Sequence, residues 1–211
     1  MGLNNSVDAA FTTAAMLDDG TPVRMRPIAS ADKSALEGIV AGMSAESRSR
    51  RFLGATSSLS PRMLRYFTEV DYVNHFALVV STVEQPDELV GVGRYIRLRD
   101  RPKAAEIAAA VVDAYSGRGI GTLVMEALTA VAQETGITTF VASVRQDNAA
   151  MRALLPSRHA RSTSAGAGVV SYEIDLATRG AELIDRPVYR RYRSAAAEVL
   201  AACQARTDQA G

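Results

Sequence analysis

The chain has 211 residues, of which 47% are hydrophobic, so a single domain can bury its own core without metal or disulfide support. Its formal net charge of +1 gives no general attraction for nucleic acid or for a membrane surface, and no apolar run is long enough to span a membrane. The single cysteine, Cys203, excludes an internal disulfide, and the first twenty residues lack a secretory signal pattern. We therefore predict a cytoplasmic globular protein that binds neither nucleic acid nor membranes.

The N-terminal part of the chain is predicted to contain a tail, one strand and several helices. Residues 1–20 are polar and aperiodic, which indicates a flexible tail. Alternating residues over 23–28 predict the first strand. Three helices are expected to follow, over residues 36–43, over residues 44–52 and from the Ser60-Pro61 pair onward. Two basic runs, 48–51 and 94–103, are interpreted as solvated because no stacking aromatics are interleaved with them.

The middle of the chain has the pattern of an antiparallel meander that leads into an α/β unit. Three strands are predicted over residues 76–80, 89–96 and 106–112. A glycine-rich turn and an amphipathic helix over 122–135 follow them. The remaining predictions are a strand over 139–144, a short helix over 148–155, a loop over 156–168 and a last strand over 169–176. This order indicates an α/β fold with a mixed, mostly antiparallel central sheet flanked by helices.

A C-terminal amphipathic helix is predicted to begin at Pro187. Its apolar stripe consists of Val188, Tyr192, Ala195, Ala196, Val199 and Cys203. The stripe either covers the domain's own core or forms the interface of a homodimer. We expect a flexible N-terminal tail over residues 1–20, a main domain over 21–178 and a C-terminal helical extension over 179–211.

The segment from Val111 to Thr122 passes from a strand through three spaced glycines directly into a helix. Glycine allows the backbone to approach a ligand closely, and the N–H groups of the turn and the helix N-terminus attract an anion such as a pyrophosphate. A Walker loop would require a lysine that this segment lacks. A dinucleotide-binding fold would place the turn on the first strand of a parallel unit, whereas here it follows a meander. A tight turn without a ligand is the structural alternative.

The turn Ser116-Gly117-Arg118-Gly119-Ile120-Gly121 resembles the signature of the GNAT acetyltransferases, Gln/Arg-x-x-Gly-x-Gly/Ala. In that family its backbone amides hold the pyrophosphate of acetyl-CoA. Ser116 departs from the pattern, and we expect Arg118 to supply the lost positive charge. The resemblance implies a GNAT fold, acetyl-CoA as co-substrate and no metal. It also implies a set of cofactor-binding residues: Val111, Val112, Arg118, Gly119, Ile120, Gly121, Thr122 and, near the thiol arm, Asn148.

Further motifs resemble Pat-type protein lysine acetyltransferases, including a mycobacterial branch that carries a cyclic-nucleotide-binding domain. The motifs are Arg26-Pro27-Ile28, Met43 to Arg48 with Arg51-Phe52, Val70-Asp71-Tyr72, His75 to Leu78, and Ala105-Glu106. We expect no such domain before Pro22, and the Gly-Phe that usually follows the Asn148 helix is missing. The resemblance implies a protein substrate with an acceptor lysine, and an acyl-CoA synthetase-type protein is a candidate.

Glu106 is the predicted general base. A lysine amine has a pKa of about 10.4, so it arrives protonated and must lose a proton before it attacks a thioester. Glu106 precedes Val112 by six residues, which places it well away from the pyrophosphate turn at about 3.3 Å per residue. The resemblance assigns the base to this position, and an exposed glutamate without a role is the alternative. The N–H groups of Val111 or Val112 are expected to polarise the thioester carbonyl.

His75 is one of two histidines in the chain. It is either a packed structural histidine or, as the resemblance implies, a catalytic residue of the acceptor cleft. The helix after Asn148 contains no tyrosine, so no general acid is assigned. The predicted reaction is direct acetyl transfer in a ternary complex, because Cys203 lies on the C-terminal helix. The alternatives are a small-molecule amine N-acetyltransferase and a catalytically weak acyl-CoA-binding regulatory module.

Overall fold

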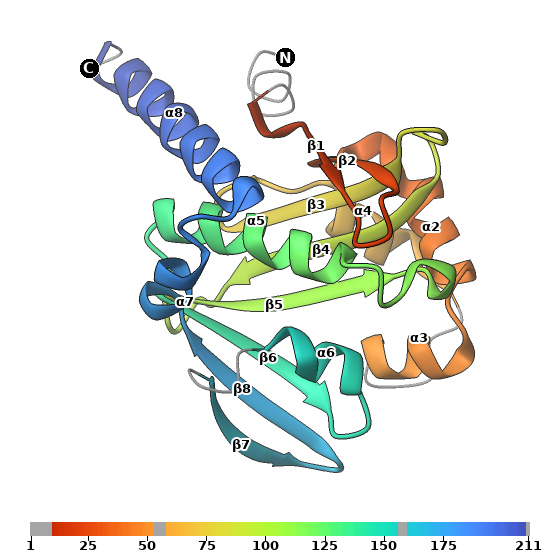
Figure 1. Ribbon diagram of the computed structural model, residues 1–211. Coiled ribbons are helices and arrows are strands. Elements are labelled where there is room, and N and C mark those ends of the chain that lie inside the picture. Colours follow the sequence, from red (N-terminus) through yellow and green to blue (C-terminus); the bar gives the residue numbers. More distant parts are fainter. Residues whose placement is uncertain (1–9, 53–57, 156–159, 210–211) are drawn as a thin grey trace.

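The computed structural model describes residues 10–52, 58–155 and 160–209, with side chains described up to residue 201. Within these residues an eight-stranded sheet has the order β1-β2-β3-β4-β5-β6-β8-β7 (Figure 1). The strands are β1 Thr13–Met16, β2 Pro22–Pro27, β3 His75–Thr82, β4 Leu89–Arg97, β5 Ala104–Val111, β6 Thr139–Arg145, β7 Ala160–Gly166 and β8 Val169–Asp175. Neighbouring strands are antiparallel except β5 and β6, which are parallel. The predicted fold class is confirmed.

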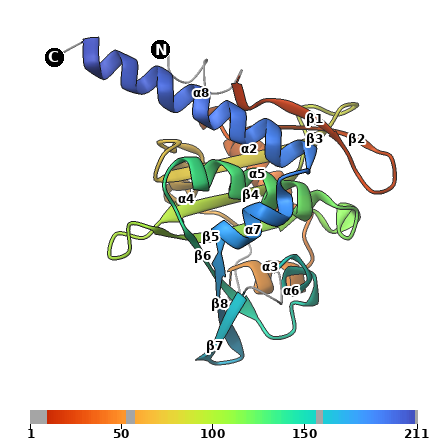
Figure 2. The same ribbon diagram turned by 60° about the vertical axis from the view of Figure 1, so that its left-hand side comes forward.

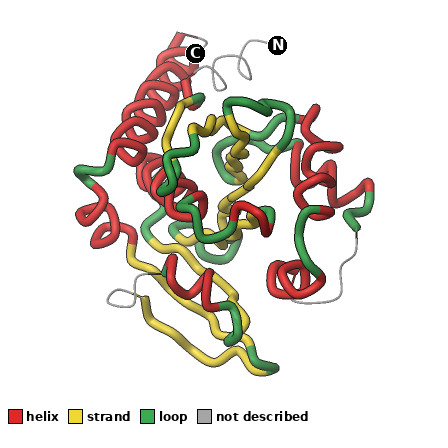
Figure 3. Tube along the Cα trace, turned by 45° about the vertical axis from the view of Figure 1, so that its right-hand side comes forward, coloured by secondary structure: helices red, strands yellow, loops and turns green. Residues whose placement is uncertain are grey.

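Helices cover both faces of the sheet, as Figure 3 shows. One group consists of α2 Lys33–Ala41, α3 Ala45–Phe52 and α4 Pro61–Thr68, preceded by the short helix η1 Ser30–Asp32. The other consists of α5 Ile120–Glu134, α7 Leu176–Leu183 and α8 Pro187–Gln209. The short helices η2 Asp113–Tyr115 and α6 Ala149–Leu154 follow β5 and β6 directly. Phe76 and Leu78 of β3 belong to the core on the α5 side, while Ala77 and Val79 belong to the core on the α2 side. This alternation buries both faces of the strand.

The parallel pair β5–β6 is short. Its register joins Ala104 to Thr139, Ala105 to Phe140 and Glu106 to Val141. Beyond Glu106 the strands separate: β5 continues to Val111 beside β4, whereas β6 continues to Arg145 beside β8. The sheet therefore opens toward the C-terminal ends of β5 and β6, close to α6 and the start of α5 (Figure 1).

The segment just before β2 differs from the predicted tail. Residues 13–16 form β1, which pairs with β2 at the edge of the sheet. Phe11 and Leu17 are each 4% exposed, and the ring of Phe11 lies 5.2 Å from that of Phe76 and 5.9 Å from that of Tyr192. Burial of these two apolar side chains attaches the segment to the core. Within the predicted tail, residues 1–9 lie outside the described part.

The predicted loop over 156–168 is wrong for most of its length. Ala160–Gly166 form β7, which pairs with β8 through a turn at Ala167. The Ser-, Arg- and Gly-rich sequence gave no strand signal because β7 is an edge strand whose side chains are almost all exposed. Residues 156–159, including His159, lie outside the described part of the chain.

The first half of α8 packs on α5 and covers the domain's own core (Figure 2). Tyr192 and Ala195 are fully buried, and Ala196 and Val188 nearly so. Arg186, just before the helix, forms a 2.7 Å ion pair with the buried carboxylate of Glu126 on α5. The core interpretation therefore holds for this half of the stripe. The side chain of Cys203 is outside the described part, and the homodimer stays a prediction.

In the residues that the structure describes, no helix is long and apolar enough to cross a membrane.

Two glycines of β4 allow α5 to lie directly against the sheet. A Cβ atom on Gly93 would be 2.1 Å from Cγ1 of Val124, and one on Gly91 would be 2.7 Å from Cγ2 of Ile120. Such distances are well inside van der Waals contact. The close approach fixes the N-terminus of α5 beside the end of β5.

We expect Gly93→Ala to destabilise the protein by about 1–3 kcal/mol, because the added methyl group overpacks the β4–α5 contact. Gly38→Ala on α2 is the control: nothing lies within 4 Å of the new Cβ, and alanine should raise helix stability by roughly 0.5–1 kcal/mol. Denaturant unfolding measures both. An unchanged free energy of unfolding in Gly93→Ala would show that α5 does not lie directly on β4.

Candidate active site

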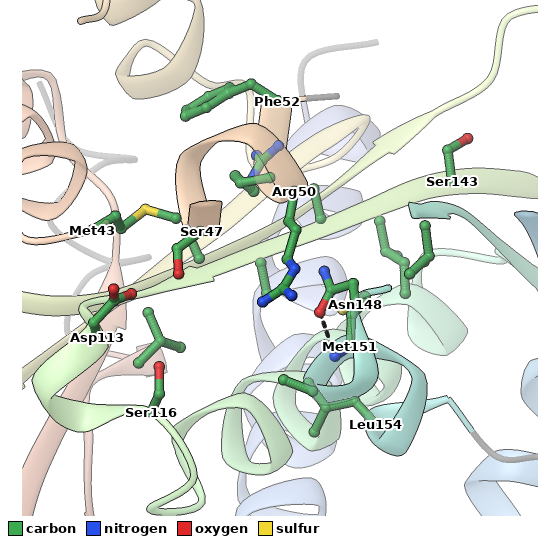
Figure 4. A pocket seen from close by; sticks show the side chains of 18 of the residues that line it. Met43, Ser47, Arg50, Phe52, Asp113, Ser116, Ser143, Asn148, Met151 and Leu154 are labelled. Carbon is green, nitrogen blue, oxygen red and sulfur yellow. Dashed lines mark hydrogen bonds between the residues drawn. The ribbon is translucent and has the colours of Figure 1, made fainter. Parts of the chain in front are cut away.

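A cavity of about 530 Å³ occupies the opening between β5 and β6. Strand β5 forms one wall from Glu106 to Val111, and Ser143 and Val144 of β6 form another. Helix α3 contributes Ser47, Arg50, Arg51 and Phe52, and α6 with its cap contributes Asn148, Ala150, Met151 and Leu154 (Figure 4). The cavity exists because two parallel strands stop pairing while each still has another partner.

The glycine turn lies at one end of this cavity. Gly117 and Gly119 have φ values of 74° and 95°, in the left-handed region that glycine adopts without strain. The first α-helical hydrogen bond of α5 is donated by Leu123 to Gly119, so the N–H groups of residues 120–122 precede it, and no side chain caps the helix. These N–H groups and the helix dipole form an anion site. The site adjoins the cavity at Gly121, because a Cβ there would lie 2.6 Å from Leu154, which lines the cavity.

The hydrogen-bond pattern of β5 decides which backbone N–H groups face the opening. The N–H of Val112 donates to Val90 O at 3.0 Å, so Val112 is engaged by β4. In an antiparallel pair successive residues alternate between pointing toward and away from the partner strand. The N–H groups of Val111 and Ala109 therefore point toward the opening, while that of Ile107 faces the last paired residue of β6. Val112 therefore cannot polarise the thioester, and a role for the Val111 N–H stays a prediction.

Asn148 lines the cavity and also caps α6. Its side-chain oxygen accepts a hydrogen bond from the Met151 N–H at 3.0 Å. In Figure 4 the Arg50 side chain points from α3 toward Asn148. Arg50 donates to Glu46 at 2.6 Å, and its Nε lies 3.7 Å from Asp147, so it reaches from α3 to the β6–α6 turn.

Glu106 is exposed on the cavity wall at the last paired position of β5 and β6. The register places His75, Ile96 and Glu106 in one row across β3, β4 and β5, so His75 and Glu106 project from the same face. Burial lowers the pKa of the Arg51 guanidinium, and the charge of Glu106 opposes that shift. A carboxylate and a guanidinium therefore share this end of the cavity.

His75 is half-buried and does not line the cavity. Its Nε2 lies 3.2 Å from Nη1 of Arg94 and its ring 5.4 Å from that of Tyr66. Arginine only donates, so Nε2 is the acceptor and Nδ1 carries the proton. Burial and the charge of Arg94 lower the pKa of His75 to about 4, which makes the imidazole neutral at pH 7. Its catalytic role stays a prediction.

Sequence reasoning missed three arginines. Arg94, within a run interpreted as solvated, is 3% exposed, stacks on Phe67 at 4.4 Å, and has a pKa that burial lowers to about 9. Arg50 and Arg51, in the other basic run, line the cavity. The one available signal was the position of Arg94 within the alternating strand Leu-Val-Gly-Val-Gly-Arg-Tyr-Ile, where a basic residue is unusual.

Arg118 points away from the cavity toward the turn between β1 and β2. It donates to Asp19 at 2.5 Å and to Thr21 at 2.7 Å, and its guanidinium lies 4.6 Å from the centre of the Tyr115 ring. The residue predicted to give the turn positive charge is therefore engaged by acidic and hydroxyl partners. Among the described residues, no group of three or more His, Cys, Asp or Glu side chains could hold a metal ion.

Residues 46–159 match the acetyltransferase (GNAT) family. The match covers more than half of the chain, so the chain belongs to the GNAT family of acetyltransferases, enzymes that use acetyl-CoA as co-substrate. The sheet order and the opening between β5 and β6 agree with this assignment.

Individual proteins to which the chain is similar include Pat-type acetyltransferases. Acetyltransferase Pat of Mycolicibacterium smegmatis is 35% identical over 153 residues, which are 72% of this chain and 45% of Pat. Acetyltransferase PA5475 of Pseudomonas aeruginosa is 31% identical over 140 residues, 65% of this chain and 74% of that protein. The crystal structure of the GNAT domain of S. lividans PAT has a TM-score of 0.72 at 30% identity, covering 79% of this chain and 98% of that chain. The chain spans less than half the length of M. smegmatis Pat. The predicted resemblance is confirmed.

We expect Gly117→Asp to weaken CoA binding at least about tenfold relative to Gly117→Asn, because the carboxylate repels the pyrophosphate at the helix N-terminus. Position 117 suits this test because no atom would lie within 4 Å of an added Cβ, and both aspartate and asparagine tolerate a positive φ. Gly119 and Gly121 are less suitable because a Cβ there meets Asp18 or Leu154. Calorimetry that gives equal affinities for the two variants would remove the anion site from this turn.

Proposed function

We propose that this chain transfers the acetyl group of acetyl-CoA to the ε-amine of protein lysines, by direct attack in a ternary complex with Glu106 as general base. The observation that carries the proposal is the position of Glu106 on the wall of the cavity whose other end meets the glycine turn. A base and an anion site thus lie at opposite ends of one unpaired strand edge.

The cofactor would lie along β5. Its pyrophosphate would occupy the N-terminus of α5, and its pantetheine arm would follow the N–H groups of Ala109 and Val111 that face the opening. Val111 follows Glu106 by five positions, which is roughly 16 Å along a strand. This separation keeps the base away from the phosphates and beside the acyl end. The thioester would therefore lie on the Glu106 side of Val111, and the Val111 N–H, which is too far from the base, is not assigned to the thioester carbonyl.

The chemical step needs one base and no covalent enzyme intermediate. Glu106 would take a proton from the acceptor ammonium, and the free amine would attack the thioester carbon. The C–N bond forms, the nitrogen gives up its second proton as the C–S bond breaks, and the departing CoA thiolate takes up that proton. His75, neutral and on the same face of the sheet as Glu106, is proposed to line the path of the acceptor amine.

Protein lysine is preferred as the acceptor because two kinds of observation agree. The sequence is similar to proteins named Pat and PAT. Glu106 is exposed at the cavity wall, where a long side chain from another protein can reach it. Acyl-CoA synthetase-type proteins are the proposed substrate class. A small-molecule amine acceptor is the competing outcome.

Glu106→Gln should lower turnover at pH 7 by about 10²–10⁴, or roughly 3–5 kcal/mol of barrier, because the amide cannot accept the amine proton. The deficit should shrink toward pH 10, where more of the lysine amine is already neutral. A pH–rate profile at saturating acetyl-CoA measures both effects, and calorimetry should find CoA affinity unchanged. Near wild-type turnover at pH 7 would place the base elsewhere.

Turnover, CoA affinity and stability of His75→Ala separate the two interpretations of His75. If His75 lines the acceptor path, His75→Ala lowers the rate per folded molecule without changing CoA affinity. Full activity per folded molecule, with only a lower free energy of unfolding, would make His75 a structural residue.

The acceptor class is tested by incubating bacterial lysate proteins with labelled acetyl-CoA and the purified chain, followed by mass spectrometry. We expect lysine acetylation that is absent with Glu106→Gln, which controls for non-enzymatic transfer. Polyamines and aminoglycosides are assayed in parallel. Acetylation of these amines without any modified protein lysine would replace the protein acceptor by a small-molecule one.

A further inference from the structure

The turn between β1 and β2 rests directly on the glycine turn. The Asp18 N–H donates to Arg118 O at 3.1 Å. The Arg118 side chain donates to Asp19 and Thr21. A Cβ atom on Gly119 would lie 2.9 Å from the Asp18 carboxylate. Residues 18–21, distant in sequence, thus contact the backbone and side chains of the turn proposed to bind the pyrophosphate.

These contacts converge on the one residue of the turn that lies between two glycines of positive φ. Glycine loses more backbone freedom on ordering than other residues, so such a turn is costly to hold in one conformation. Arg118 is held at its backbone carbonyl and at its guanidinium, by three neighbouring residues of the β1–β2 turn. Fixing Arg118 at both places restricts the peptide groups of Gly117 and Gly119 on either side.

The β1–β2 turn is itself anchored in the core. Leu17, at its start, is 4% exposed, and Val23 and Met25 of β2 are fully buried. The Leu17 N–H donates to Thr21 O at 2.9 Å, which closes the turn. The glycine turn is therefore held by a rigid part of the fold and not by a loose segment.

The local charges argue against a direct role for Arg118 in attracting phosphate. Asp18, Asp19 and Arg118 together carry a net charge of −1. Hydrogen bonds from Thr21, followed by Arg118, lower the pKa of Asp19 to about 2, so this carboxylate remains ionised at any working pH. An anion bound beside this group must be held by backbone N–H groups in the correct geometry, and that geometry is what the contacts secure.

We propose that the β1–β2 turn, residues 17–21, is a positioning element of the cofactor site that holds the glycine turn in its CoA-binding conformation through the Asp19–Arg118 pair. The inference rests on the proposed place of the pyrophosphate at this turn. It assigns Arg118 a positioning role in place of phosphate contact. Preorganisation of this kind raises affinity by lowering the ordering cost of binding.

Asp19→Ala should raise the Kd of CoA about tenfold and the KM for acetyl-CoA similarly, with kcat at saturating acetyl-CoA within roughly twofold of wild type. Thr21→Val, which removes only one contact to Arg118, should have a smaller effect in the same direction. Asp87→Ala, in the exposed turn between β3 and β4, is the control for loss of a surface carboxylate. Thermal unfolding of each variant confirms that the fold is retained.

Arg118→Ala and the double variant with Asp19→Ala complete a cycle. A positioning pair gives similar losses in both single variants and no further loss in the double variant. Amide hydrogen exchange should accelerate at residues 117–121 in both Asp19→Ala and Arg118→Ala and remain unchanged in Asp87→Ala. Because the first two variants change the local charge in opposite directions, electrostatics alone would not accelerate exchange in both.

Two results would overturn the inference, and they differ from failure of the site itself. Tighter CoA binding by Asp19→Ala would show that Asp19 competes with the phosphates for Arg118. Unchanged binding by Asp19→Ala, with strong loss by Gly117→Asp, would leave the site in place without this positioning element. Unchanged binding by Gly117→Asp relative to Gly117→Asn would instead remove the pyrophosphate from the turn.

Discussion

Parallel pairing between β5 and β6 ends at Glu106 and Val141, and the rest of the site depends on that interruption. Each strand remains paired on its other side, so the separation costs only the hydrogen bonds along the facing edges. Those edges leave backbone N–H groups of β5 directed into a cavity that also receives side chains from α3 and α6. A strand edge inside a domain is otherwise an unsatisfied surface. Here it is the surface along which a cofactor rich in amide groups would bind.

Close packing of α5 on β4 sets the position of the α5 N-terminus relative to the opening between β5 and β6. The absence of side chains at Gly91 and Gly93 lets the helix lie against the sheet, and this brings its N-terminus to the end of the opening. The anion site and the unpaired edge therefore have a fixed separation. Glu106 marks the other end of the same edge, where pairing begins. The distance between Glu106 and the helix N-terminus follows from the length of one strand.

The charges near Glu106 show how burial changes the chemistry of ordinary side chains. Arg94 is enclosed under Phe67 and beside His75, and the proximity of the two groups favours a neutral imidazole. Arg50 and Arg51 bring two further positive charges to the cavity wall. In solution these arginines would be equivalent, whereas in the fold one packs in the interior and two face the opening. Their roles follow from the helix or strand that carries each one.

Sequence alone determined the elements whose signals are local: the glycine turn, the amphipathic helix after it, the alternating strands of the meander and the position of Glu106 upstream of the turn. These rest on periodicity and on backbone freedom, which neighbouring residues decide. Tertiary structure decided the rest. Phe11 and Leu17 form part of the core only because β2 offers an edge to β1, and Ala160–Gly166 form a strand only because β8 is beside them. The partners of Arg118 lie almost a hundred residues away in the chain, and no local pattern records such a contact. Pairing at an edge and ion pairing between distant segments depend on which surfaces the fold brings together.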